Sequence, residues 1–372
     1  MTADDYRPGL EGVVAGETAI STIAGGLQYR GYSIDVLADQ ASFEETAYLV
    51  LFGELPTAEE LNAFRNRLAR SSSVPAEVLR FLRSVPNAAP LMDVLRTATS
   101  MLAHWDPDAA DNSHEANVRK TERLIAQIPV IVAARYRISQ DKEPVGPDSR
   151  CSFAENVLRM LLRQSPDQRA VRAMDVSLIL YMEHEFNAST FSARVVCSTL
   201  SDLHSSITAA IGALKGPLHG GANERVLRVL EEIGSAERAE SWVREAFEKK
   251  VRIMGFGHRV YKQGDPRATY LKQRCAELAE QAGKQEMEIM AETIERIVRE
   301  EKGLPPNLDW PSARLYHYLG LPVELYTPLF VVSRVVGWCA HVIEQLDNNR
   351  LIRPRSRYTG PSNRPWQAIA DR

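Results

Sequence analysis

Two histidines of this chain each lie in a glycine-rich segment, where the side chain and the backbone can approach a ligand together. The first is His219, in the segment K-G-P-L-H-G-G-A-N at residues 215–223, between two stretches with helical periodicity. Glycine lets the backbone come close to a ligand, and the N–H groups that open a helix favour negative charge. His219 could therefore face an anionic ligand, or it could be a solvent-facing histidine after a helix end.

The segment R-I-M-G-F-G-H-R-V-Y-K at residues 252–262 contains the second histidine, His258. Its glycines resemble a dinucleotide-binding fingerprint. However, Val260 occupies the third glycine position and no strand–helix–strand unit surrounds the segment, which argues against a Rossmann site. Arg259 and Lys262 could instead hold the phosphates of a nucleotide-bearing substrate. The alternative is a basic surface loop.

A carboxylate in apolar surroundings is the third candidate. Asp309 is flanked by Leu308, Trp310 and Pro311, and such surroundings tend to raise the pKa of a carboxyl group. A raised pKa suits a general base. On local sequence alone, however, a helix N-cap before Pro311 explains Asp309 better than catalysis does.

An arginine in a strongly apolar helix is the fourth candidate. Arg334 lies within L-F-V-V-S-R-V-V-G-W-C-A at residues 329–340, and a buried arginine is costly unless it is paired. Its partner could be a ligand carboxylate, which arginine binds through two hydrogen bonds, or a carboxylate of the protein. His184 in E-H-E and Arg267 in D-P-R are weaker signals, which ordinarily mark a satisfied polar pair or a solvated turn.

The elements that must position these residues are mainly helical, because apolar residues recur at spacings of three and four and alternating strand patterns are rare. A short hairpin with a glycine turn is the exception, within residues 12–32. Polar loops are expected at residues 106–117 and 139–150. Helices are predicted at residues 43–53, 154–162, 171–181, 206–214, 223–233, 242–250 and 270–282, and another follows the capping box that begins at Thr57.

Length and composition are those of an ordinary globular protein. The chain has 372 residues, which is too long for one small hydrophobic core and predicts two or three domains. Hydrophobic residues make up 44% of the chain and charged residues 25%, and the net charge of −3 favours neither nucleic acid nor an acidic membrane surface as a partner.

Cysteine content and the N-terminal sequence bear on the location of the protein. The chain contains four widely spaced cysteines, Cys151, Cys197, Cys275 and Cys339, without a C-x-x-C pair. This argues against a disulfide framework and a structural zinc site. The first residues, M-T-A-D-D-Y-R-P, contain no apolar signal segment. The apolar stretch at residues 329–343 is interrupted by polar side chains and is expected to be too short to cross a bilayer. A cytoplasmic location is therefore expected.

The last twenty residues differ from the rest of the chain. Residues 353–372 contain Pro354, Pro361 and Pro365, several arginines and few aliphatic side chains, which predicts an extended arm. Composition alone favours an arm that frays in solvent slightly over one that wraps a partner subunit.

Taken in order and spacing, the motifs G-P-L-H-G-G-A-N, G-F-G-H-R-V-Y-K, D-P-R, N-L-D and S-R resemble those of the citrate synthase family. The resemblance runs from Gly9 to Pro354. It implies an almost wholly helical, all-α fold with two domains and an active site in the cleft between them. The large domain would comprise residues 1–220 and 321–372, and the small domain residues 221–320.

The resemblance also implies roles for individual residues. His219 matches the histidine that hydrogen-bonds the thioester oxygen of acetyl-CoA as the enol or enolate forms, and Asp309 matches the base that removes the methyl proton. His258 matches the histidine that polarises the ketone of oxaloacetate and donates a proton to it. Behind Asp309, W-P-S-A replaces the aromatic residue and Y-S-G of many members, which affects local packing rather than the aspartate itself.

Substrate-binding residues are implied in the same way. Oxaloacetate would be held by His184, Arg267 and Arg334, together with an Arg353 that reaches into the neighbouring subunit's site. That match makes a homodimer the minimum unit, leaves larger assemblies open, and favours a subunit-crossing arm over fraying. Residues expected beside the nucleotide of coenzyme A are Ile253, Met254, Gly255, Phe256, Gly257, Arg259 and Lys262.

The implied function is that of citrate synthase, a transferase of the tricarboxylic acid cycle that converts the acyl group into an alkyl group. It condenses acetyl-CoA with oxaloacetate and water and needs no metal or further cofactor. The nearest alternative is 2-methylcitrate synthase, which uses propionyl-CoA and differs by one methylene. A metal-dependent hydrolase built on His184, His219, His258 and Asp309 lacks an H-E-x-x-H spacing. A non-catalytic protein that binds coenzyme A would not need the three intact candidates.

Overall fold

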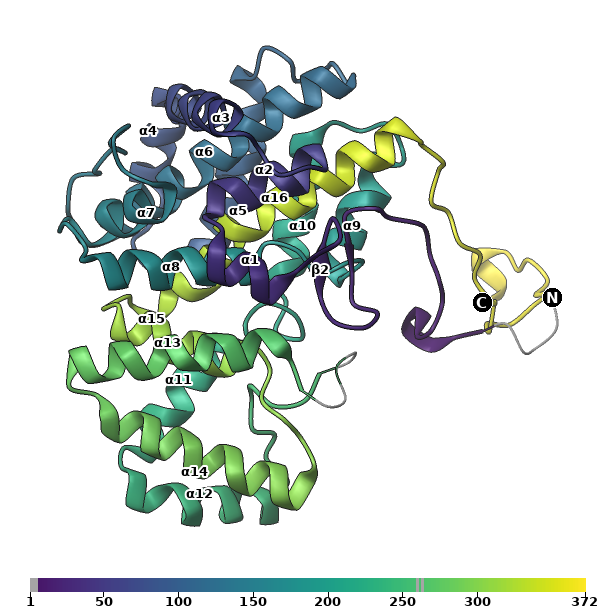
Figure 1. The fold of residues 1–372 in the computed structure, drawn as a ribbon. Helices are drawn as coiled ribbons and strands as arrows, with labels where there is room; N and C mark the ends of the chain where they lie inside the picture. The colour runs from purple at the N-terminus through teal and green to yellow at the C-terminus, as the bar shows by residue number, and fades with distance from the viewer. Residues whose placement is uncertain (1–5, 259–260, 262–263) are drawn as a thin grey trace.

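The computed structural model describes residues 6–258, 261 and 264–372, and their fold is mainly helical, as predicted (Figure 1). The helices are α1 (Ile34–Gln40), α2 (Phe43–Phe52), α3 (Ala58–Ser71), α4 (Ala76–Ser84), α5 (Leu91–Leu102), α6 (His114–Ser139), α7 (Phe153–Leu162), α8 (Gln168–Tyr181), α9 (Ala188–Cys197), α10 (Leu203–Leu214), α11 (Ala222–Ile233), α12 (Ala236–Glu248), α13 (Pro266–Ala282), α14 (Gln285–Lys302), α15 (Asp309–Tyr318) and α16 (Tyr326–Asp347). Short 3-10 turns occur at Pro8–Leu10, Ala103–Trp105, Val323–Leu325 and Ile369–Asp371.

A small antiparallel sheet lies near the N-terminus, where the hairpin was predicted. Its strands are β1 (Ser21–Thr22), β2 (Gln28–Tyr29) and β3 (Tyr32–Ser33), in the order β1-β2-β3. Gly25 and Gly26, at φ +75° and +115°, form the turn between β1 and β2. The third strand was not predicted, and it lies at the end of the predicted hairpin segment, residues 12–32.

Helix ends follow the local signals closely where a cap is present. Ser42 and Thr57 each form both hydrogen bonds of a capping box, and Gly53 ends α2 in the left-handed conformation. The polar loop predicted across residues 106–117 is wrong at its end, because α6 begins at His114. Ser113, which resembled a loop residue, is the N-cap of α6 and accepts the N–H of Ala116.

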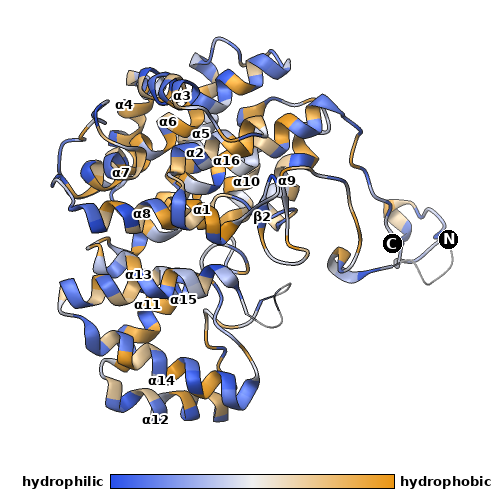
Figure 2. Ribbon diagram, viewed as in Figure 1, coloured by the Kyte–Doolittle hydropathy of each residue, from blue (hydrophilic) through white to orange (hydrophobic). Residues whose placement is uncertain are grey.

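Helix α16 forms the centre of the core, in contact with α2, α5, α6, α8, α9, α10 and α11. The segment Val323–Asp347 is long and apolar enough to cross a bilayer, contrary to the sequence prediction, but 89% of its most apolar window is buried inside the protein. That burial is typical of a core helix. In outer helices such as α14, hydrophilic and hydrophobic residues instead alternate along the helix (Figure 2). The buried residues of α14 recur at helical spacing, so they form one apolar face.

Helices α11 to α15 form a group below the other helices in Figure 1. Within it α12 packs on α14, and α13 packs on α14 and α15; α13 also contacts α1 and α8 outside the group. The group corresponds in sequence to the predicted small domain, residues 221–320. The two-domain division itself stays a prediction.

The described N-terminal segment, from Tyr6 onward, and the C-terminal arm both extend away from the helices and lie near each other (Figure 1). The C-terminal arm, residues 353–372, is exposed throughout. Arg357 of this arm stacks on the ring of Tyr6 in the N-terminal segment, with the guanidinium carbon 4.8 Å from the ring centroid. The predicted extended arm is therefore present, with an N-terminal neighbour that the sequence did not indicate.

Candidate active site

A cleft of about 2190 Å³ is lined by residues from α11 to α15, from the connections between them and from the remainder of the chain. Six residues predicted as site residues line it: His184, His219, His258, Arg267, Asp309 and Arg334. The expected coenzyme A loop, residues 253–257, lines it as well. Arg353 does not, because it lies on the exposed arm. Arg259 and Lys262 lie outside the described residues.

His219 lies in the turn between α10 and α11, as predicted. Its N–H donates to the carbonyl of Gly216 at 2.9 Å, and the N–H of Gly220 donates to the carbonyl of Leu214 at 2.9 Å. A Cβ on Gly220 would lie 2.5 Å from that second carbonyl oxygen. Only glycine therefore lets this turn close and present the imidazole at the cleft.

The imidazole of His219 is held through its Nε2 atom. Ser189 Oγ lies 2.8 Å from Nε2, and the backbone N–H of Ser189 donates to the same nitrogen at 3.3 Å. Because a backbone N–H can only donate, Nε2 is an acceptor and the neutral ring carries its proton on Nδ1. Burial, followed by the charge of Arg334, lowers the pKa of His219 to about 4. His219 is thus a neutral N–H donor at pH 7.

His258 and His184 lie next to each other, with ring centroids 5.3 Å apart. Tyr261 contacts both: its hydroxyl is 3.1 Å from Nε2 of His184, and its backbone N–H donates to Nδ1 of His258 at 3.3 Å. The second bond leaves the proton of a neutral His258 on Nε2. Burial, followed by the charges of Arg267 and Arg334, lowers the pKa of His184 well below its usual value.

Asp309 is the first residue of α15 and not its N-cap, so the capping alternative is wrong. The N-cap position belongs to Leu308, and Asn307 accepts the N–H of Asp309 at 3.1 Å. The Oδ1 atom of Asp309 accepts a hydrogen bond from the Tyr181 hydroxyl at 2.9 Å. Burial raises the pKa of Asp309 to about 6, against the lowering effects of that bond and of Arg267. The carboxylate is mostly ionised at pH 7 and can accept a proton.

The loop expected to contact coenzyme A is tied to the segment that carries Asp309. Phe256 forms an antiparallel bridge with Pro306, and the N–H of Asn307 donates to the carbonyl of Gly255 at 2.9 Å. Gly255 has φ +88°, and a Cβ there would lie 2.9 Å from the Trp310 ring. The loop and the base therefore belong to one local structure.

Arg334 is 2% exposed, and no carboxylate of the described residues forms an ion pair with it. Its Nε donates to the backbone carbonyl of Tyr181 at 2.6 Å, and its guanidinium carbon lies 4.8 Å from the Phe330 ring centroid. Burial lowers the pKa of Arg334 to about 10, against the raising effect of Glu183, so the side chain is still charged at pH 7. A buried cation with so few partners favours the ligand-carboxylate interpretation over the structural ion pair.

Arg267 has a carboxylate partner, unlike Arg334. Its Nε and Nη2 donate to the two oxygens of Asp265 at 2.9 and 2.8 Å. Burial alone would lower the pKa of Arg267, but Asp265 raises it above its usual value. Asp265 also caps α13 by accepting the N–H of Arg267 at 3.1 Å. The satisfied polar pair is therefore present, and its arginine nonetheless lines the cleft.

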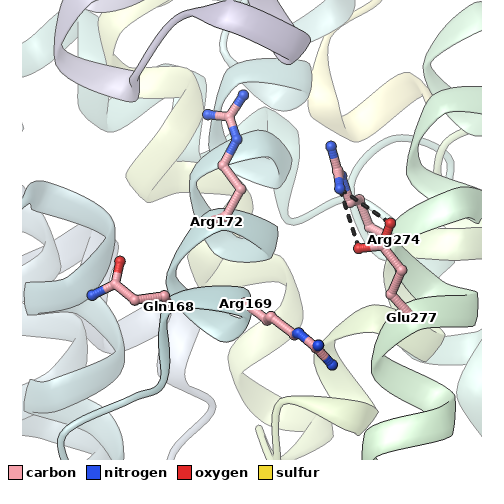
Figure 3. A pocket seen from close by; sticks show the side chains of 5 residues that line it. All are labelled: Gln168, Arg169, Arg172, Arg274 and Glu277. Atoms are coloured by element: carbon pink, nitrogen blue, oxygen red, sulfur yellow. Dashed lines mark hydrogen bonds and ion pairs between the residues drawn. The ribbon is translucent and has the colours of Figure 1, made fainter.

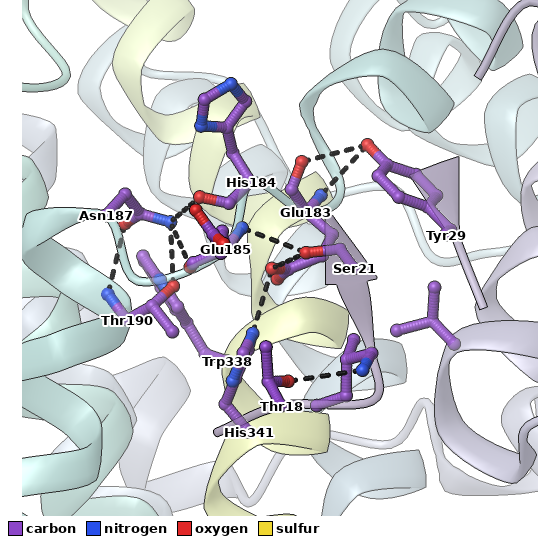
Figure 4. Close-up of polar contacts among 12 residues, drawn as sticks. Thr18, Ser21, Tyr29, Glu183, His184, Glu185, Asn187, Thr190, Trp338 and His341 are labelled. Atoms are coloured by element: carbon purple, nitrogen blue, oxygen red, sulfur yellow. Dashed lines mark hydrogen bonds and ion pairs between the residues drawn. The ribbon is translucent and has the colours of Figure 1, made fainter. Parts of the chain in front are cut away.

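A buried polar network fixes the segment that carries His184 (Figure 4). Glu183 accepts a hydrogen bond from Ser21 Oγ at 3.0 Å and contacts Nε2 of His341 at 2.9 Å. The hydroxyl of Tyr29 donates to the backbone carbonyl of Glu183 at 3.0 Å. Because Ser21 and Tyr29 belong to β1 and β2, the small sheet helps to position the cleft.

Several residues at the site were not identified from the sequence: Tyr181 lines the cleft, and the buried Ser189 is the hydrogen-bond partner of His219. Tyr181 and Ser189 act through contacts between distant segments, which no local pattern reveals. A basic rim also lines the cleft, formed by Arg225, Arg228, Lys250, Arg252 and Lys302. The spacing of three between Arg225 and Arg228, directly after the His219 turn, was the available signal for this rim.

A second, smaller pocket of about 190 Å³ lies between α8 and α13 (Figure 3). It contains Arg169, Arg172 and Arg274, but Arg172 already donates to the backbone carbonyls of residues 38, 39 and 41, and Arg274 pairs with Glu277. None of the predicted site residues lines it. Within the described chain, no three His, Cys, Asp or Glu side chains gather as a metal-ligand set, so the hydrolase alternative finds no support there.

Comparisons with known proteins identify the family of the chain. The family model for the citrate synthase C-terminal domain matches residues 9–355. The chain is 50% identical over 367 residues to citrate synthase 2 of Bacillus subtilis, covering 98% of each chain. It is 44% identical to 2-methylcitrate synthase 2 of Corynebacterium glutamicum, covering all of this chain and 99% of the relative.

Solved structures share the whole fold. Citrate synthase from Thermotoga maritima matches with a TM-score of 0.88 and 41% identity over 99% of each chain. A ternary complex of Thermoplasma acidophilum citrate synthase with carboxymethyl coenzyme A and oxaloacetate matches with a TM-score of 0.93 and 35% identity, over 98% of this chain and 99% of that one. Together with the cleft described above, these matches establish that the chain belongs to the citrate synthase family.

Proposed function

We propose that this enzyme condenses acetyl-CoA with oxaloacetate and water to give citrate and coenzyme A. The observation that carries the proposal is Arg334, a buried cation without a carboxylate partner in the described chain, in the same cleft as His219 and Asp309. A dicarboxylate substrate supplies the missing negative charge. The relative of 50% identity named citrate synthase 2 supports acetyl-CoA as the other substrate.

The acyl half of the reaction uses Asp309 and His219. Asp309 removes a proton from the methyl group of the thioester, and negative charge then develops on the thioester oxygen. The Nδ1–H of His219 donates to that oxygen, and a preorganised donor of this kind is typically worth about 2.7–4 kcal/mol. A neutral histidine suits the role, since it donates without protonating the oxygen outright.

The oxaloacetate half uses His258, His184 and the two arginines. Arg334 and Arg267 hold the carboxylates, and His184 contributes a further polar contact. The Nε2–H of His258 polarises the ketone and transfers a proton to its oxygen as the carbon–carbon bond forms. Water then hydrolyses the citryl thioester, and no step in this scheme calls on a metal or a further cofactor.

Coenzyme A lies in this proposal along the loop at residues 253–257. The basic rim offers several cations for its phosphates, in addition to Arg259 and Lys262. The enzyme works as a homodimer or a larger homo-oligomer, in which Arg353 enters the partner subunit's cleft. A cytoplasmic location fits the four unpaired cysteines.

The alternative is 2-methylcitrate synthase activity with propionyl-CoA, and it rests on relatives of that name at 43–44% identity. One methylene changes specificity by only about 1–3 kcal/mol, so measurement must decide. We expect thiol release with oxaloacetate and a higher kcat/KM for acetyl-CoA than for propionyl-CoA. A propionyl-CoA preference would establish the alternative, and failure to release thiol from either thioester would refute both. Activity retained after exhaustive chelation would exclude the metal-dependent hydrolase alternative.

A further inference from the structure

Two hydroxyl groups connect the base of the proposed reaction to the body of α15. Tyr181, the last residue of α8, has its Oη 2.9 Å from Asp309 Oδ1 and 2.6 Å from Ser312 Oγ. Tyr181 is 2% exposed and Ser312 is fully buried. No described residue donates to the other carboxylate oxygen of Asp309, Oδ2, and Asp309 lines the cleft. One oxygen is thus held by the protein while the other is left for a substrate.

The direction of the protons in this chain follows from what each group can donate. An ionised carboxylate only accepts, so the Tyr181 hydroxyl must donate to Asp309. The short Tyr181–Ser312 contact of 2.6 Å is then a bond from Ser312 to the tyrosine oxygen, and it is shorter than the 3.3 Å contact of Ser312 Oγ with the backbone carbonyl of Asp309. Hydrogen bonds in such a chain polarise one another, and a donor that also accepts becomes a better donor. Burial, followed by the charge of Asp309, raises the pKa of Tyr181 well above its usual value, so the donated proton stays on the tyrosine.

Tyr181 also contacts the group proposed to bind oxaloacetate. Its backbone carbonyl accepts the hydrogen bond from Nε of Arg334, and its ring packs on Phe330 with centroids 4.4 Å apart. One residue therefore contacts both the arginine for the first substrate and the base for the second. The ring contact with Phe330 does not involve the hydroxyl.

We propose that Tyr181 is a positioning residue, which holds Asp309 through Oδ1 so that Oδ2 faces the methyl group of the thioester, while Ser312 directs the tyrosine proton toward the base. This inference rests on the proposed function. Tyr181 keeps the carboxylate ionised and in register with Arg334. The charged and titratable groups of the described chain that interact with Asp309 include Tyr181 from α8, Arg267 and Asp265 from the start of α13, Tyr316 from α15, and Arg334 from α16.

The test is Tyr181→Phe, which keeps the ring on Phe330 and removes only the hydroxyl. Loss of a hydrogen bond to a charged group predicts a decrease in kcat of roughly 10- to 100-fold. KM for oxaloacetate should change little, because the backbone carbonyl that binds Arg334 remains. The acid limb of the kcat/KM profile should move to higher pH, because the ionised form of Asp309 loses a donor.

The chain offers a matched control on the same two helices. Tyr316 of α15 and Ser177 of α8 form another buried hydroxyl pair, 2.8 Å apart, without a hydrogen bond to Asp309. Tyr316→Phe should leave the acid limb in place. An equal shift in Tyr316→Phe would mean that packing between α8 and α15, and not the tyrosine hydroxyl, sets the effect, and would overturn the proposal.

Ser312→Ala provides a second variant that does not depend on the folding of Tyr181→Phe. It should lower kcat less than Tyr181→Phe and move the acid limb in the same direction. If the wild-type enzyme is active but the pH profile of kcat/KM is unchanged in both Tyr181→Phe and Ser312→Ala, the positioning role is refuted and the proposed function stays intact. A wild-type enzyme without thiol release would instead refute the proposed function.

Discussion

Asp309 combines two properties that a general base needs near neutral pH: a raised pKa and a carboxylate oxygen left open to a cleft. The sequence showed the apolar neighbours that raise the pKa, but it favoured a helix cap. The cap interpretation failed because Leu308 already has helical backbone angles and Asn307 accepts the N–H of Asp309. Tyr181 was missed because it lies 128 positions from Asp309 in sequence.

The pH dependence of turnover follows from the ionisation of Asp309. The base works only when ionised, and burial raises its pKa to about 6, so kcat/KM should fall about tenfold per pH unit below pH 6. His219, with a pKa of about 4, stays neutral through this range and adds no second step. The measurement is a kcat/KM profile from pH 5 to 8, with circular dichroism at each pH to exclude unfolding.

In Asp309→Asn, turnover should fall about 10²- to 10⁴-fold, and unchanged turnover would contradict the assignment of the base.

At the scale of elements, the sequence predicted some of the helices next to the site, but it gave no range for α9 or α14. Helix α11 was predicted to within one residue of its start, whereas α12 and α13 begin six and four residues before their predicted starts. The bridge between Phe256 and Pro306 joins segments about fifty residues apart. Such a bridge depends on tertiary contact, so no local periodicity in the sequence predicts it.

Gly255 provides a test of that bridge. Gly255→Ala adds the strain of a positive φ and a Cβ 2.9 Å from both Trp310 and Val226. Gly283→Ala adds the same kind of strain at φ +64° with nothing within 4 Å. Thermal unfolding should show that Gly283→Ala lowers the free energy of unfolding by about 1–2 kcal/mol. Gly255→Ala should lower it by an additional amount of about 1–3 kcal/mol, because the new methyl group overpacks the site. KM for acetyl-CoA should rise only in Gly255→Ala, and equal effects of the two variants would show that the contact with Trp310 does not matter.

At the scale of the whole molecule, family and fold were predictable because five motifs occur in order between residues 216 and 334, within a resemblance that runs from Gly9 to Pro354. Both predictions are confirmed. The roles of the site residues, the domain boundaries and the assembly stay predictions. The cleft brings six of the predicted side chains together. Arg353 lies apart from them on the exposed arm, and its entry into a partner subunit's cleft stays a prediction.

Mixing two inactive variants tests the arm. Co-expression of Asp309→Asn with Arg353→Ala produces heterodimers in which one cleft combines an intact Asp309 with the partner subunit's Arg353. Random pairing makes half of the dimers mixed, each with one working cleft, so about a quarter of wild-type activity should return. If Arg353 served its own cleft, every cleft would lack one of the two residues and no activity would return.

The place of Arg334 in the central helix has a consequence for the evolution of the protein. A charged side chain in the middle of α16 weakens the core that the helix is built to form, and replacing buried charges with well-packed apolar residues is often stabilising by about 1–4 kcal/mol. Selection for heat tolerance alone would therefore favour the loss of this arginine. With the proposed role in binding a substrate carboxylate, the presence of Arg334 in the core is a trade-off in which substrate recognition outweighs the stability of the core.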